Sequence, residues 1–182
     1  MSSLTSRYYD TLLRHLLTKD RAAFLELPGA EEDDITQVLE AYPNAPVDVI
    51  ELLRLRDGTP FELPILGWHN GDFWEGYSLN SCRDIIGNKS RESIIDFYGI
   101  DYIESEGDEI FDPRIDVTIP MFRRLFFAAD TTFYQLYVDV DPAPGGTVGQ
   151  VIRFAGDGDE WLVIAPSFAD YLQQVIDAYG YP

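Results

Sequence analysis

Cysteine and histidine are nearly absent from this chain, and their scarcity excludes several kinds of chemistry. The one cysteine, Cys82, cannot form an internal disulfide, so nothing indicates an oxidising compartment. The two histidines, His15 and His69, lie too far from it in sequence to predict a zinc site. A pair of His69 with Ser78 or Cys82 is conceivable as base and nucleophile, but no G-x-S-x-G elbow accompanies it. We therefore predict no catalytic residue, no metal and no cofactor.

Long apolar runs and basic residues are scarce as well. The longest apolar stretches, such as residues 125–129, are far shorter than the roughly 18 residues that span a bilayer, and residues 1–10 lack the apolar core of a signal peptide. Thirteen Lys and Arg oppose 32 Asp and Glu, for a net charge of −19. This charge disfavours nucleic acid and anionic membranes and attracts basic partners, unless it serves solubility alone. We expect a cytoplasmic protein.

The apolar residues that are present follow helix and strand periods. Hydrophobic residues make up 46% of the 182 residues, which favours one domain over 1–182. Phe168, Tyr171, Leu172 and Val175 share one helix face, and Ser167 precedes them as a cap. Similar patterns predict helices at 4–25, 31–42, 46–56, 91–98 and 167–179 and strands at 73–79, 117–122, 133–140, 148–154 and 161–165. The order predicts an α+β fold, with helices packed against a central, mostly antiparallel sheet.

Two stretches are candidates for binding a partner. Residues 96–116 hold eight acids against one base, Arg114, and form either a charged patch or a solvated loop. Residues 68–77 combine aromatic and acidic side chains, which suits a hot spot for a basic partner, or else alternate members are core residues of a strand. The candidate contact residues are Trp68, Asp72, Trp74, Glu75 and Tyr77 from the second stretch, and Asp101, Glu104, Glu106, Asp108 and Glu109 from the first.

Four sequence blocks carry a family resemblance. Residues 27–35 read Leu-Pro-Gly-Ala-Glu-Glu-Asp-Asp-Ile, and residues 46–58 start at a proline and end in Asp-Gly. Residues 137–152 contain Asp-Val-Asp-Pro and later Gly-Gln-Val-Ile, and residues 165–172 read Ala-Pro-Ser-Phe-Ala-Asp-Tyr-Leu. In this order and spacing, over about residues 27–179, the blocks resemble the SUKH (Smi/Knr-like) superfamily. The chain departs from the family pattern at 128–132, which lacks a Gly-rich turn, and in the length of the acidic stretch.

The resemblance implies structural roles for the motif residues and no shared enzymatic activity. Turns are implied for Gly58, Pro142 and Gly149 and a helix cap for Ser167, with Asp139 and Phe168 as further structural positions. Bacterial members are thought to be immunity proteins that neutralise toxins, often nucleases, so the resemblance implies a basic toxin domain as partner. The alternative is a regulatory scaffold of the Smi/Knr type without a toxin. Immunity to a basic toxin also agrees with the acidity, because nucleases need basic clefts for their substrates.

Overall fold

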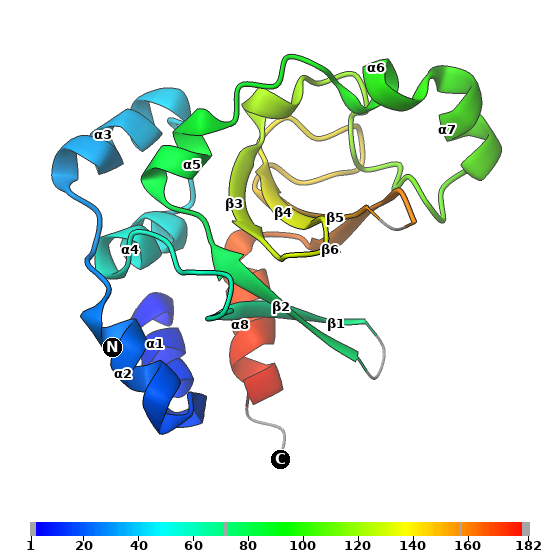
Figure 1. Ribbon diagram of the computed structural model, residues 1–182. Coiled ribbons are helices and arrows are strands. Elements are labelled where there is room, and N and C mark those ends of the chain that lie inside the picture. The colour runs from blue at the N-terminus through cyan, green and yellow to red at the C-terminus, as the bar shows by residue number, and fades with distance from the viewer. Residues whose placement is uncertain (1–2, 71–72, 157, 180–182) are drawn as a thin grey trace.

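Helices come first, a curled antiparallel sheet follows, and a helix closes the chain (Figure 1). The computed structural model describes residues 3–70, 73–156 and 158–179. The helices are α1 (Leu4–His15), α2 (Thr18–Glu26), α3 (Glu32–Ala41), α4 (Val47–Leu55), α5 (Cys82–Gly87), α6 (Ile94–Tyr98), α7 (Ile100–Glu106), the 3-10 turn η1 (Met121–Arg123) and α8 (Phe168–Tyr179). The strands are β1 (Leu66–Asn70), β2 (Phe73–Leu79), β3 (Leu125–Ala129), β4 (Tyr134–Asp139), β5 (Gln150–Ala155) and β6 (Glu160–Ala165). The predicted α+β class is confirmed.

The sheet has the order β1-β2-β3-β4-β5-β6, and every neighbouring pair is antiparallel. Strands β2 and β3 pair only at Ser78–Ala129 and Leu79–Ala128. The β1–β2 hairpin therefore projects away from the other strands, which curl beside it (Figure 1). Helices α5, α6 and α7 all lie in the segment between β2 and β3.

Two hydrophobic cores cover the two faces of this sheet. The main core packs α1, α3, α4, α5 and α8 against one face, and α8 contributes the apolar stripe expected from its sequence. The second core lies under α6 and the residues after α7, and consists of Ile94, Phe111, Ile115, Tyr137, Ile152 and Trp161. In β4, Leu136 and Val138 face the main core while Tyr137 faces the second. This alternation follows from the two-residue period of a strand.

Several sequence predictions differ from the structure. Residues 4–25 form two helices, because Leu16 and Leu17 are extended between α1 and α2. The strand predicted at 117–122 is wrong: η1 begins within this segment, and the strand begins only at Leu125. Pro120 has no N–H for a strand ladder, and the buried Arg124 side chain binds carbonyl oxygens of this segment instead. Strand β1 and helices α5 and α7 were not predicted.

Candidate protein-binding surface

Helices α6 and α7 carry four of the eight acids of the acidic stretch, and local bonds define the ends of α6. Ser93 and Asp96 form a capping box: the Ser93 hydroxyl accepts from the Asp96 N–H at 3.2 Å and the Asp96 carboxylate from the Ser93 N–H at 3.0 Å. Gly99, at φ +81°, ends α6 and allows α7 to start at once. The segment therefore folds as two short helices at one end of the molecule (Figure 1). It is not the solvated loop that its charge alone favoured.

The residues after α7 tie this unit to the edge strand β6. The Trp161 N–H donates to the Ile110 carbonyl at 2.7 Å, and the Asp112 N–H donates to the Trp161 carbonyl at 2.9 Å. The ring of Tyr98 contacts that of Phe111 at 5.5 Å, and its hydroxyl donates to the Asp159 carboxylate at 2.8 Å. These contacts hold α6, α7 and the residues after α7 in a fixed position beside the sheet.

All five acids predicted in this stretch are exposed. They form no ion pair with any residue that the structure describes. Large apolar side chains share this surface: Phe97 is 71% exposed, Ile100 46% and Tyr102 37%. We call it the acidic face, defined as Asp101, Glu104, Glu106, Asp108 and Glu109 together with Phe97, Ile100 and Tyr102. Exposed apolar side chains can mark a contact surface, and charges of one sign beside them suit a partner of the opposite charge.

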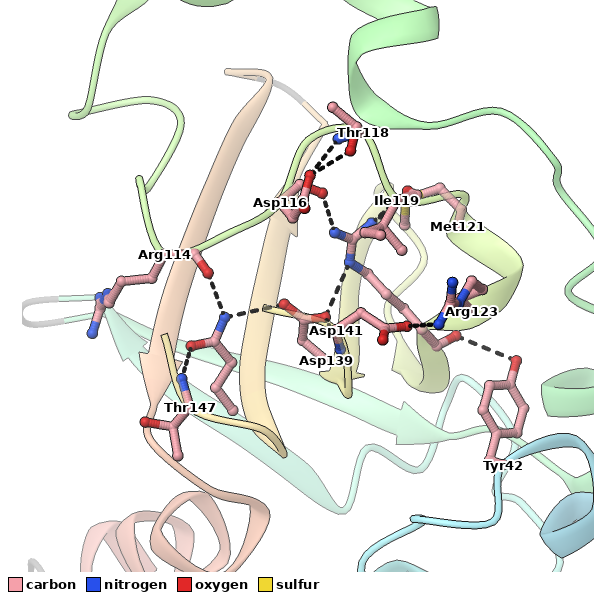
Figure 2. A network of polar contacts seen from close by, with 12 residues as sticks. Tyr42, Arg114, Asp116, Thr118, Ile119, Met121, Arg123, Asp139, Asp141 and Thr147 are labelled. Carbon is pink, nitrogen blue, oxygen red and sulfur yellow. Dashed lines mark hydrogen bonds and ion pairs between the residues drawn. The ribbon is translucent and has the colours of Figure 1, made fainter. Parts of the chain in front are cut away.

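A buried polar network holds the segment that follows the acidic face (Figure 2). The Arg124 guanidinium donates to the carbonyl oxygens of Asp116 at 2.6 Å and Ile119 at 3.0 Å. Its Nε lies 3.6 Å from the Asp139 carboxylate, and both side chains are fully buried. The Gln150 amide donates to Asp139 at 3.1 Å. Arg124 and Gln150 therefore hold the loop of residues 114–119 against strands β3 to β5.

The charges of this network are balanced inside the protein. Burial raises the pKa of the Asp139 carboxyl above its ordinary value, although the Arg124 guanidinium opposes the shift. The Gln150 amide also donates to the Arg114 carbonyl at 3.0 Å, so one side chain joins β5 to the loop. We assign the network to folding, since neither charged group can reach a partner.

The family model of the SMI1 / KNR4 family (SUKH-1) matches residues 29–174. The chain belongs to this family. No curated protein sequence matches the chain. The match covers all the strands and every helix from α3 to the middle of α8, and leaves α1 and α2 outside. The acidic face lies within the matched region.

The motif residues of this SUKH-1 chain lie where turns, caps and core packing need them. Gly58 and Gly149 have φ values of +81° and +89°, which side-chain-bearing residues rarely adopt. The Ser167 hydroxyl accepts from the Asp170 N–H at 3.1 Å, and Phe168 is buried beneath that first turn. Pro142 lies in the loop between β4 and β5, directly after the buried Asp139 region.

The aromatic and acidic side chains of residues 68–77 mainly contact other residues of the same protein. Asp72 lies outside the described residues. Tyr77 is fully buried, so it cannot touch a partner in this fold, and its hydroxyl donates to Glu75. Glu75 is paired with Arg153 at 2.6 Å. The prediction of a contact role for Tyr77 was wrong because this end of β2 turns into the main core.

The two tryptophans of the same stretch are half-buried. Trp68 stacks on the Arg153 guanidinium, whose carbon lies 4.7 Å from the ring centroid. Trp74 packs against His69 at 4.9 Å and Tyr179 at 5.8 Å, and covers Gly67. These contacts explain both rings as packing between the β1–β2 hairpin and its surroundings. A role in partner binding stays a prediction for them.

Groups suited to catalysis or metal binding are not brought together. Within the described ranges, no three His, Cys, Asp or Glu side chains are arranged to hold a metal ion. Burial raises the pKa of the Cys82 thiol to about 12, which keeps it protonated and unreactive. His69 contacts the Trp74 ring. No helix in the described part of the chain is long and apolar enough to cross a membrane.

Proposed function

We propose that this SUKH-1 protein is a non-enzymatic binding protein whose acidic face holds a basic partner protein in the cytoplasm. The observation that carries the proposal is the grouping of five unpaired carboxylates with three exposed apolar side chains on α6, α7 and the turn after α7, a segment that is bonded to the sheet. Carboxylates of one sign speed the approach of a basic surface, and the apolar side chains supply area that is desolvated on contact. Fixed helices lose little freedom on binding.

The partner that this surface fits best is a toxin domain, which makes the protein an immunity protein. A nuclease toxin needs a basic cleft to bind phosphates, and a complementary acidic surface can occupy that cleft and keep substrate out. The family also supports a second candidate, a regulatory scaffold of the Smi/Knr type that binds an endogenous protein.

Capture from the native organism with two matched variants tests the proposal. One variant neutralises the five acids of the acidic face, and the other neutralises five exposed acids elsewhere: Glu26, Glu31, Asp33, Glu40 and Glu62. Both change the net charge equally. We expect the wild type and the second variant, but not the first, to retain one basic protein. That protein should be toxic when produced alone and harmless beside the wild type. Equal capture by both variants would exclude the acidic face, and a harmless partner would favour the scaffold.

A further inference from the structure

Three basic side chains that line two neighbouring hollows form neither an ion pair nor a hydrogen bond with any residue that the structure describes. Nine of the thirteen Lys and Arg side chains are engaged: Arg54, Arg114, Arg123, Arg124 and Arg153 form ion pairs, and Arg7, Arg14, Arg21 and Arg56 donate hydrogen bonds. Arg83, Lys89 and Arg91 are exposed, and within the described ranges none has an ion pair or hydrogen bond. In a chain with 32 acids, three neighbouring cations left unpaired are unexpected.

Lys89 and Arg91 border an apolar hollow. The hollow has a volume of about 630 Å³, and its apolar lining includes Tyr42, Ile86 and Phe122. No acidic residue lines it. Its walls are held in place, because the Phe122 N–H donates to the Ser90 carbonyl at 2.9 Å and the Tyr42 hydroxyl to the Phe122 carbonyl at 2.9 Å. The hollow is therefore cationic, apolar and preformed.

A second hollow of about 860 Å³ adjoins the first and shares Asn88 with it. Arg83 lines it together with two exposed phenylalanines, Phe61 at 56% and Phe133 at 76%.

Two acids also line the second hollow, but turns of the chain engage both. Asp84 bonds the Ser81 cap of α5, with its carboxylate 2.6 Å from the Ser81 hydroxyl. The Asp130 carboxylate accepts from the N–H groups of Thr132 and Tyr134, both at 2.8 Å. These bonds hold Asp84 through its Oδ2 and Asp130 through both oxygens, and the second hollow offers the apolar surface of Phe61 and Phe133 rather than a second cationic site.

The backbone of Phe133 is strained. Its φ is +80°, a conformation that is an outlier for a bulky residue and easy only for glycine. This turn nevertheless carries an exposed phenylalanine. A strained residue whose side chain points largely into solvent gains little from packing within the chain, and such strain is retained where a side chain serves a site.

We propose that the two hollows form one groove that binds an extended segment of a partner protein with alternating acidic and apolar side chains. Acidic side chains would pair with Lys89 and Arg91, and apolar ones would fill the lining near Phe122, Phe61 and Phe133. At physiological salt, charges more than about 8 Å away are largely screened. A segment bound beside Lys89 and Arg91 therefore responds to these two cations more than to the net charge of the whole protein. A nucleic acid would extend beyond the groove onto surface of its own sign. The lining of this groove includes no residue of the acidic face, so binding there does not depend on the role of that face.

Fluorescence anisotropy with a short labelled peptide of alternating Asp and Leu or Phe tests the groove. We expect saturable binding, weakened by about tenfold or more in Lys89→Glu/Arg91→Glu. The control is Lys19→Glu, which changes an exposed lysine on α2 outside the groove. It should leave the affinity unchanged. Phe133→Gly should weaken binding severalfold while leaving the folded state intact, because glycine suits the positive φ. Replacing the peptide's acids with Lys, or its apolar residues with Ser, should abolish binding.

Four results would overturn the proposal. The first two are that the acidic and apolar peptide does not bind, or that it binds equally well to Lys89→Glu/Arg91→Glu. The third is that a single-stranded oligonucleotide of equal length binds more tightly than the peptide. The fourth is that the protein sediments as a dimer and that the same double variant dissociates this dimer. The last two would assign the groove to nucleic acid or to a second copy of this chain.

Discussion

Replacing Arg124 with Met should destabilise the protein strongly. The substitution removes the guanidinium that donates to the carbonyl oxygens of Asp116 and Ile119 and faces Asp139 at 3.6 Å. The Asp139 carboxylate, fully buried, then keeps only the Gln150 amide and one backbone N–H. Leaving one partner of a buried pair uncompensated costs about 3–5 kcal/mol. We expect a loss of that size in the free energy of unfolding.

Urea unfolding followed by tryptophan fluorescence measures this loss, and the adjacent residue provides the control. Arg123 pairs with Asp141 but is 49% exposed, so Arg123→Met should cost less than about 1 kcal/mol. Adding Asp139→Asn to Arg124→Met should recover part of the loss, since it removes the unpaired charge. A loss below about 1 kcal/mol for Arg124→Met, equal to that of Arg123→Met, would refute the assignment of the network to folding.

Three smaller effects are also expected. Phe133→Gly should raise the free energy of unfolding by about 0.5–1 kcal/mol, because it relieves the strained φ; a loss would show that the ring packs in the folded state. Gly58→Ala should cost more than Gly149→Ala in the same assay, because its Cβ would lie 2.8 Å from the Ser81 nitrogen, whereas nothing lies near Gly149. Burial raises the pKa of Asp112, but the Arg114 side chain and two backbone N–H groups outweigh it, so the net pKa is lowered. Its contribution is therefore full above the unfolded pKa of about 3.9 and lost as the pH falls through the folded value; Asp112→Asn should lower stability at neutral pH and flatten the acid side of the stability curve.

The elements with clear periodicity could be predicted from the sequence. Helix α8 follows from its apolar stripe and Ser167, and β2 lies at 73–79 as expected. Helix α5 is only six residues long, too short for a helical period to show. The false strand at 117–122 arose because apolar residues alternate there while Pro120 and Arg124 impose another conformation. Tertiary contacts override local pattern in such segments.

In the candidate site, too, some features follow from the local sequence and others depend on tertiary contacts. The five acids follow from the charge pattern, but helix α7, which carries three of them, follows only from the apolar residues interleaved with them. Tyr98, Tyr102 and Ile103 contact the aromatic and apolar side chains beneath α7, and that pattern was the available signal. The contact role predicted for Tyr77 was wrong because its hydroxyl donates to Glu75, which pairs with Arg153, 78 residues further along the sequence. No local rule predicts such a pairing.

The central claim is that the acidic face holds a basic partner, and the association rate constant of the captured partner tests it most directly. It should be measured for the wild type, the variant neutralised at the acidic face and the variant neutralised at Glu26, Glu31, Asp33, Glu40 and Glu62, at low and at physiological salt. We predict a rate that falls steeply with salt for the wild type and the second variant, and a slow, nearly salt-independent rate for the first. Identical rates and salt dependence in all three proteins would contradict the claim.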